Sequence, residues 1–273
     1  GIVIGEVFFA FPHALMILIT ALSVADARLY EAAESLRAKP ARIFFTVTLP
    51  GCRYGLVSAA LVVFTLIFTD FGVPKVIGGA YNVLATDVYR QVIGQFNFQM
   101  GAVVGLILLL PAILSFAVDR IVQRKQVALL SARAVPLQPK PRQTTDRLFL
   151  ALVTLVAGFL LLVLGMAAFG SLAKLWPYNL SLTLKWYDFS RVGTDGWGPY
   201  FNSLRLAACV ALIGTTIIFS GAYLIEKSRG ASRLRTALHF LAMIPLAVPG
   251  IVLGLSYIFF FNAPDNPLNF IYG

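Results

Sequence analysis

The chain has 273 residues, of which 59% are hydrophobic and 12% are charged. A soluble domain carries about 25% charged and 45–50% apolar residues, so this composition excludes an ordinary water-soluble globule. It also excludes disorder, because a chain this apolar has ample surface to bury. The formal net charge of +10 leaves two interpretations, a nucleic-acid-binding surface or the charge asymmetry of a membrane protein.

The positions of the 22 Lys and Arg residues decide between these interpretations. Sixteen of them lie in three segments, 24–53, 120–147 and 226–235, and only five lie in the segments that alternate with these. Cation-rich loops on alternate sides follow the positive-inside pattern of membrane proteins. The three segments are therefore predicted to face the cytoplasm. The lipid bilayer is predicted as a partner of the chain, and nucleic acid is not.

The stretches between the charged segments predict an all-α, polytopic transmembrane helical bundle. Each stretch is close to the ~20 residues with which an α-helix crosses the ~30 Å hydrocarbon core. About six spans are expected, near residues 5–25, 51–70, 100–119, 147–173, 201–225 and 236–262.

A linker at 126–146, rich in cations and proline, divides the spans into two blocks of three, residues 1–125 and 147–273. On this topology both ends of the chain face outward, and no initiator Met precedes the first apolar stretch. We therefore expect the chain to be a piece of a longer protein.

The two predicted outer loops, residues 71–99 and 171–199, are longer than most connections. They either cover the mouth of a pathway and contact an external partner, or form short interfacial helices. Aromatic side chains would anchor such a helix in the second loop at the membrane interface; these are Trp176, Tyr178, Trp186 and Tyr187.

The cytoplasmic segment 24–53 has a pattern of its own. Ser23 followed by Asp26 three residues later predicts a capping-box helix start. Pro40 cannot continue that helix, but it suits the first turn of a second one. The pattern predicts a short amphipathic helix, a break and a second helix ending near Leu49 and Pro50. The first helix has an exposed apolar stripe at helical spacing, formed by Leu29, Ala32, Ala33 and Leu36.

Residues 31–50 read EAAESLRAKPARIFFTVTLP, which resembles the cytoplasmic EAA motif of inner-membrane permease subunits of binding-protein-dependent ABC importers. The family motif is EAA, three residues, Gly, nine residues, Ile, one residue and Leu-Pro. Arg37 stands where the family has Gly, and Val47 where it usually has Ile; the break between the helices falls at Arg37 or at Pro40. The positions that match in register are Glu31, Ala32, Ala33, Leu49 and Pro50.

Further phrases are similar to the branch of this family that joins two permease halves in one chain and serves iron(III) and 2-aminoethylphosphonate. They are DFGVPKVIGG at 70–79, NSLRLA at 202–207 and IPLAVPGIVLGL at 244–255. The amino-acid sequences of residues 70–99 and of residues 126–136, QVALLSARAVP, most resemble the 2-aminoethylphosphonate type. The resemblance implies the end of one six-span half, then the beginning of a second whose own EAA loop lies beyond residue 273.

The resemblance also implies the partners and the location. The EAA segment would be a coupling helix docked in a cytoplasmic ATP-binding cassette ATPase dimer, and a periplasmic or extracellular binding protein would deliver the solute. The protein would be multi-pass in the bacterial inner membrane and would hold no cofactor, because ATP and Mg bind the partner ATPase. The coupling residues implied are Glu31, Ala32, Ala33, Leu36, Arg37, Leu49 and Pro50.

The residues themselves are compatible with this role. An amphipathic helix laid in a partner's groove buries its apolar stripe, although the same helix also suits the inner lipid interface. The chain contains no G-x-x-x-x-G-K-[ST], G-x-S-x-G or H-E-x-x-H motif. No catalytic residue and no metal site are therefore predicted, and ATP hydrolysis is expected on a separate subunit.

The transport path is the last prediction. Only Glu6, Asp70 and Arg205 approach the spans, so a proton relay is poorly supported. Prolines free backbone carbonyls that a water-lined cavity can satisfy, although close helix packing also explains small residues. The alternatives to an ATP-driven permease are an ATP-independent secondary transporter or channel, and a membrane anchor or scaffold. The predicted substrate-path residues are Pro245, Pro249, Gly250, Gly254 and Asn202.

Overall fold

The computed structural model describes residues 1–129, 135, 137, 141, 143–191, 196–227, 234–235, 237–238, 241–242 and 248–271. The chain forms two compact units, one of residues 1–139 and 241–273 and the other of residues 140–240. The last 33 residues thus group with the first unit.

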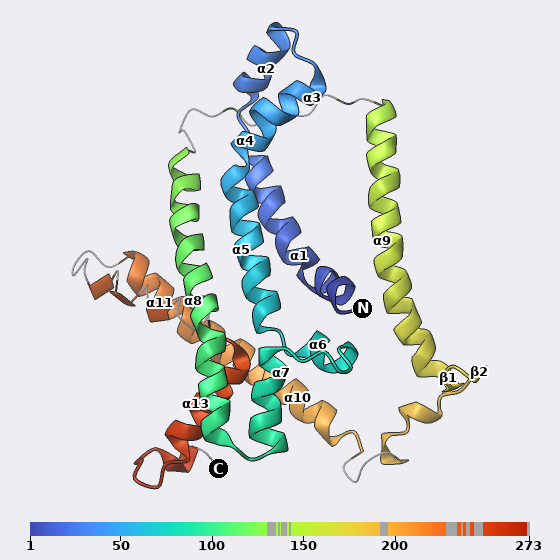
Figure 1. Ribbon diagram of the computed structural model, residues 1–273, viewed down its shortest axis with the longest axis vertical. Helices are drawn as coiled ribbons and strands as arrows, with labels where there is room; N and C mark the ends of the chain where they lie inside the picture. Colours follow the sequence, from blue (N-terminus) through green and yellow to red (C-terminus); the bar gives the residue numbers. More distant parts are fainter. Residues whose placement is uncertain are drawn as a thin grey trace. The chain divides into compact units, whose positions relative to one another are not determined.

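The first unit is built on three long helices, α1 (Ile2–Ser23), α5 (Arg53–Thr69) and α8 (Phe98–Leu129). α5 packs against both α1 and α8. Short helices occupy the two ends of this bundle (Figure 1). At one end lie α2 (Ala27–Ser35), α3 (Pro40–Ile43), the π-helical η1 (Phe44–Thr48) and α4 (Leu49–Gly51). At the other lie α6 (Gly72–Ile77), α7 (Leu84–Tyr89), the π-helical η2 (Arg90–Gly94), α13 (Gly250–Phe261) and η6 (Asn269–Ile271).

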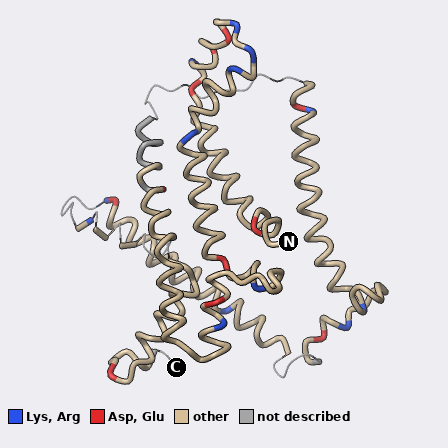
Figure 2. The backbone as a smooth tube through the Cα atoms, in the orientation of Figure 1, with Lys and Arg blue, Asp and Glu red and all other residues tan. Residues whose placement is uncertain are grey.

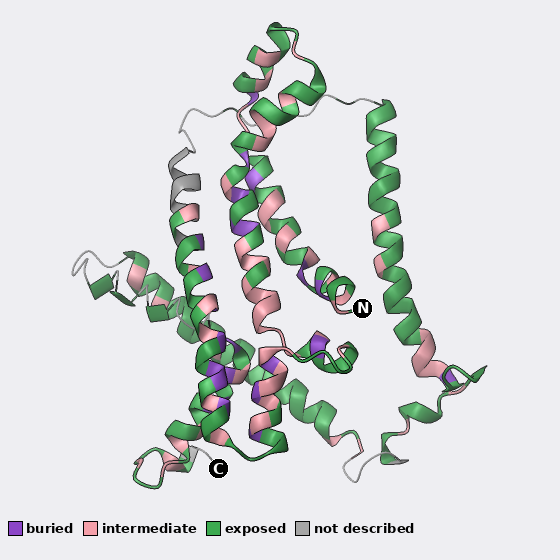
Figure 3. Ribbon diagram, in the orientation of Figure 1, coloured by how far each residue is buried: buried purple, intermediate pink, exposed green. Residues whose placement is uncertain are grey.

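The apolar core of this unit lies between α7, α8 and α13, where Figure 3 shows a concentration of buried residues. Val252 and Leu255 place one face of α13 in it. Glycines of α8 permit the close approach: a Cβ at Gly101 would lie 2.4 Å from Val92 Cγ2, and one at Gly105 would lie 3.4 Å from Val252 Cγ2. The GxxxG spacing in α8 therefore serves helix packing. The buried residues are Ala85, Val88, Val92, Val104, Leu108, Val252 and Leu255.

A polar seam joins α5 to α8. The Ser58 hydroxyl donates to Asp119 Oδ1 at 2.5 Å, and both residues are buried. The Ser115 hydroxyl donates to the Leu61 carbonyl at 3.1 Å. Hydrogen bonds between helices hold membrane bundles together where lipid tails provide no hydrophobic driving force for association. We call these two contacts the α5–α8 seam.

The second unit contains α9 (Gln143–Leu172), the antiparallel strands β1 (Ala173–Leu175) and β2 (Asn179–Leu182), and two 3-10 turns, η3 (Lys185–Tyr187) and η4 (Phe189–Arg191). It continues with α10 (Gly198–Cys209), the π-helical η5 (Val210–Gly214) and α11 (Thr215–Lys227). For the outer loop 171–199, one expectation was an interfacial helix. The structure has a β-hairpin followed by two short 3-10 turns there. The Trp186 Nε1–H donates to the Ala173 carbonyl at 2.9 Å, which ties the turn to the strand.

Helices long and apolar enough to cross a membrane agree with the predicted spans within the described residues. They are Ile2–Ser23, Phe98–Asp119, Gln143–Leu172 and Gly198–Lys227. A fifth arises if Pro40–Gly51 and Arg53–Thr69, bent by 63°, count as one span. Of the predicted sixth span, Gly250–Phe261 is helical, and most of 236–249 lies outside the described residues. The all-α polytopic fold is confirmed.

Candidate functional site

The start of α2 is fixed by Asp26. Its carboxylate accepts the Arg28 backbone N–H at 3.1 Å and also binds the Arg28 guanidinium. That side-chain hydrogen bond lowers the pKa of Asp26 to about 2. The expected capping box at Ser23 is wrong, because α1 continues to Ser23, whose hydroxyl donates back to the Thr20 carbonyl. Asp26 is the N-cap instead.

The end of α2 falls at the position where the family motif has glycine. Arg37 adopts a φ of 55°, the left-handed conformation that glycine adopts without strain. The Arg37 N–H donates to the Glu34 carbonyl at 2.8 Å and the Ala38 N–H to the Ala33 carbonyl at 3.0 Å. These two bonds form a Schellman motif. The helix therefore breaks at Arg37 although no glycine is present.

Pro40 begins the next helix. The two predicted positions of the break, Arg37 and Pro40, therefore lie on either side of it. Lys39 is extended and Pro40 occupies the first turn of α3, where the missing N–H has no cost. The chain then widens into the π-helical η1 and reaches Pro50 in α4. Cys52, with φ −96° and ψ 6°, separates α4 from α5, and the axis bends there by 63°.

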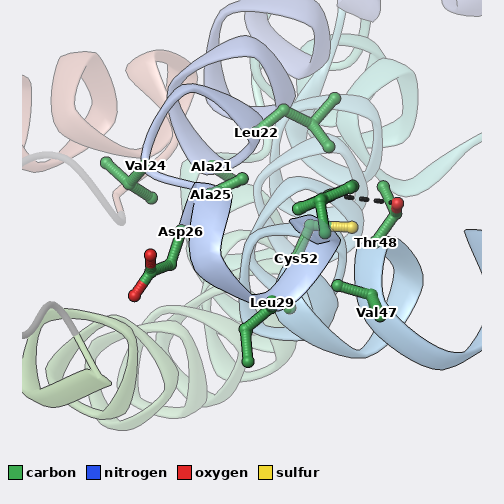
Figure 4. A pocket seen from close by; sticks show the side chains of 11 residues that line it. Ala21, Leu22, Val24, Ala25, Asp26, Leu29, Val47, Thr48 and Cys52 are labelled. Carbon is green, nitrogen blue, oxygen red and sulfur yellow. Dashed lines mark hydrogen bonds between the residues drawn. The ribbon is translucent and has the colours of Figure 1, made fainter. Parts of the chain in front are cut away.

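The two arms of this segment are tied together at its base. The Tyr30 hydroxyl donates to Thr48 Oγ1 at 3.0 Å, which links α2 to η1. A pocket of ≈ 250 Å³ lies beside this bond. Figure 4 shows Leu29, Val47 and Cys52 around the pocket, together with the end of α1. We call residues 24–53 the coupling loop, after the role that the sequence resemblance predicts for them.

The predicted coupling residues lie mainly on the surface of this loop. Glu31, Ala32, Arg37 and Pro50 are exposed, while Ala33 and Leu49 are half-buried. Leu36 is 83% exposed. Leu29, Phe44 and Phe45 add further exposed apolar surface, and Figure 2 shows charges of both signs around it. An exposed apolar patch rimmed by charge is typical of a docking surface.

The predicted substrate-path residues are only partly tested. Pro249 is the N-cap of α13, and a Cβ at Gly250 or Gly254 would meet nothing within 4 Å. These glycines lie on the exposed face of α13, opposite its buried Val252 and Leu255. Pro245 lies outside the described residues, and exposed Asn202 belongs to α10 of the other unit. The path remains a prediction.

Sequence reasoning missed Asp119, which is 6% exposed and belongs to the α5–α8 seam. The available signal was an acidic residue at the last position of the predicted third span, just before a cation-rich segment. Ionisable residues at such depth face the interior of the bundle and pair there. Among the described residues, no three His, Cys, Asp or Glu side chains are grouped to hold a metal ion.

The apolar spans and the exposed helical loop together define a polytopic membrane protein with an exposed apolar patch at one end of its first unit. Residues 1–127 match the family of binding-protein-dependent transport system inner membrane components. The all-α fold fits the MetI-like permease fold of that family, and the chain is a multi-pass protein of the inner membrane. These observations make the chain similar to membrane components of binding-protein-dependent transport systems.

Individual relatives agree with this class. The chain is 29% identical over 269 residues to the putative ferric transport system permease protein FbpB 1 of Haemophilus influenzae, covering 96% of this chain and 42% of that protein. It is 29% identical over 275 residues to the ferric transport system permease protein FbpB of Actinobacillus pleuropneumoniae, covering 98% and 39%. The chain thus spans about two fifths of the length of these relatives.

Another relative, which matches over a shorter stretch, is named for a different transported solute. The molybdenum transport system permease protein ModB of Azotobacter vinelandii is 38% identical over 79 residues, 29% of this chain and 35% of that protein. The relatives named here are transport permeases, and no solved structure matches the chain significantly.

Proposed function

We propose that the chain is part of the membrane-spanning permease subunit of an ATP-driven importer. The observation that carries the proposal is the coupling loop, an amphipathic α2 that is capped at both ends and held at the end of α1 and α5. Its Leu29 and Leu36 are exposed rather than packed on its own unit. The match of residues 1–127 to an inner membrane component family supports the same role.

The coupling loop is proposed to dock in a groove of a cytoplasmic ATP-binding cassette ATPase. Docking would bury the exposed apolar side chains, and Glu31 would pair with a cation at the rim of the groove. Closure of an ATPase dimer around ATP and Mg would then move the loop and the helices attached to it. An external binding protein would deliver the solute, and this chain would perform no hydrolysis itself.

The cargo is proposed from two observations of different kinds. Two relatives are named for ferric transport and match nearly the whole chain, which supports iron(III). The amino-acid sequence at 70–99 and 126–136 resembles the 2-aminoethylphosphonate type. None of the relatives named above supports that solute. We therefore place iron(III) before 2-aminoethylphosphonate.

Charge reversal in the coupling loop tests the proposal. Glu31→Lys is expected to lower ATP-dependent uptake at least about tenfold, because like charges facing each other across an interface cost several kcal/mol. The matched control is Asp265→Lys, the same charge change at an exposed residue beyond α13. Membrane insertion should be equal for both variants. Normal uptake by the Glu31 variant contradicts ATPase docking through this surface.

Crosslinking gives an independent measurement. Glu31→Cys, in a chain whose Cys52 and Cys209 are replaced by Ala and Ser, is expected to crosslink to the ATPase subunit in the assembled transporter. Crosslinks to lipid headgroups alone would favour a helix lying on the inner membrane interface. Uptake that persists without any ATPase subunit would favour the secondary transporter or channel.

A further inference from the structure

The segment that follows α9 exposes aromatic and aliphatic side chains. We call residues 173–187, which form β1, β2 and η3, the outer hairpin. Two of the chain's three tryptophans lie in it, and a two-stranded hairpin is at best marginally stable in water by itself. The outer hairpin therefore requires a surface that covers its apolar side chains. Its aromatic residues, between 44% and 87% exposed, are Trp176, Tyr178, Trp186 and Tyr187.

The strand β2 has one apolar and one polar face. Successive side chains of a strand point to opposite faces, so Leu180 and Leu182 share one face while Asn179 and Ser181 share the other. The two leucines are 48% and 70% exposed. On the polar face, Asn179 Oδ1 accepts the Ser181 N–H at 3.1 Å and the Ser181 hydroxyl at 2.7 Å. A strand with two such faces fits a boundary between an apolar phase and water.

The outer hairpin is fastened to the last turn of α9. The Trp176 ring lies edge-on to the Phe169 ring, with 6.3 Å between the ring centroids. The Ser171 and Tyr187 hydroxyls share a hydrogen bond of 2.8 Å. Figure 1 shows both strands at the end of this helix. The depth of the hairpin in the membrane therefore depends on where α9 leaves the bilayer.

The last turn of α9 marks the edge of the bilayer. α9 is long and apolar enough to cross a membrane, and none of its residues is buried. Residues 148–172 carry no charge and form a stretch longer than the ~20 residues that the ~30 Å hydrocarbon core requires. The next helix long enough to cross begins at Gly198, so the hairpin belongs to a connection that leaves and re-enters the same face of the bilayer. Trp and Tyr are enriched at this depth, where their rings meet both headgroups and acyl chains.

The charges of the outer hairpin suit phospholipid headgroups. Lys174 and Lys185 are exposed, and no acidic residue occurs between positions 173 and 187. The Lys185 Nζ lies over the Trp186 ring, 5.3 Å from its centroid. Lysine can keep its aliphatic stem on an apolar surface while its ammonium group reaches the polar phase, where it can bind phosphate. Charge complementarity therefore favours a phospholipid surface as the partner.

We infer that the outer hairpin lies in the headgroup region of the outer leaflet and anchors the end of α9 there. Leu180 and Leu182 face the acyl chains, and Asn179 and Ser181 face water. The surface that covers the apolar face is phospholipid and not an external protein. The inference rests on the membrane location of the chain and is independent of the proposed transport.

Spin labels on two adjacent residues test this arrangement. Leu182→Cys and Ser181→Cys each carry a nitroxide in the full-length protein, whose other cysteines are replaced, in nanodiscs of phosphatidylethanolamine and phosphatidylglycerol. Both residues are exposed, so the label displaces no buried side chain. Oxygen concentrates in hydrocarbon and nickel–EDDA in water. The ratio of oxygen to nickel–EDDA collision rates is expected to be several-fold higher at position 182 than at position 181.

A charge on the apolar face gives a second measurement. Leu180→Lys, combined with the label at position 182, should lower the collision ratio there, because the charge disfavours contact with the acyl chains. The matched control Ser181→Lys adds the same charge on the polar face and should leave the ratio high. An equal ratio in these two variants overturns the assignment of the faces.

The remaining outcomes separate lipid from protein as the partner. A high ratio at position 182 that persists when the proposed binding protein is added supports the lipid anchor. Equal ratios at positions 181 and 182 overturn it. Loss of both oxygen and nickel–EDDA access at position 182 on addition of the binding protein also overturns it, because protein would then cover the apolar face.

Discussion

Replacing Arg37 by glycine should stabilise α2. Arg37 holds a φ of 55°, and a non-glycine residue in the left-handed region costs roughly 1–2 kcal/mol. Glycine removes this cost while the bonds from the residue 37 and Ala38 amides to the Glu34 and Ala33 carbonyls are kept. A gain of 1–2 kcal/mol corresponds to an about 5- to 30-fold smaller population of the opened helix.

Hydrogen exchange of the α2 amides, followed by mass spectrometry of the detergent-solubilised protein, measures this gain. Arg37→Ala is the matched control, because it removes the guanidinium and retains the Cβ that causes the strain. Protection should therefore rise in Arg37→Gly and stay near the parent value in Arg37→Ala. Equal protection in all three proteins, or a rise in both variants, would refute the assignment of strain to the backbone.

Three other predictions concern stability. Ser58→Ala should lower the free energy of unfolding by about 1–3 kcal/mol, because the buried Asp119 carboxylate loses a donor; thermal unfolding in detergent measures this, with exposed Ser203→Ala as control. Gly101→Ala should cost about 1–3 kcal/mol through its contact with Val92, whereas Gly254→Ala should cost far less in the same assay. Asp26→Ala should lower the protection of the α2 amides, because the helix loses its N-cap. Because the pKa of Asp26 is depressed to about 2, its contribution should persist above pH ~4 and disappear as the pH falls toward 2, which exchange measured across this range would show.

The arrangement of the coupling loop was largely predictable, because it depends on local sequence. The spacing of Leu29 and Leu36 predicts an amphipathic helix, and Pro40 predicts the start of the next. The choice between Arg37 and Pro40 was not predictable, since it depends on whether the Schellman bonds offset the strain of a side chain at positive φ. The structure places Arg37 in that conformation, so the register of the motif is kept without its glycine.

Long-range pairing could not be read from the sequence. Ser58 and Asp119 are 61 positions apart, and no local pattern brings them together. The same holds for Glu6, which the sequence placed only near the end of a span. Its burial depends on α6 lying against Gly5, a contact that follows from the connection after α5. The hairpin after α9 was likewise missed, and no local pattern indicates the hydrogen bond from the Trp186 indole to the Ala173 carbonyl beside it.

The α5–α8 seam gives the proposed coupling a physical route. α4 continues into α5 through the bend at Cys52, so a displacement of the loop moves the start of α5. Ser58 and Ser115 then fasten α5 to α8, and α8 carries α7 and α13 on its packed face. If α5 moved apart from α8, these hydrogen bonds would break. Movement of α5, α8, α7 and α13 as one body avoids that cost, and it would extend an event at the proposed ATPase to the opposite end of the unit.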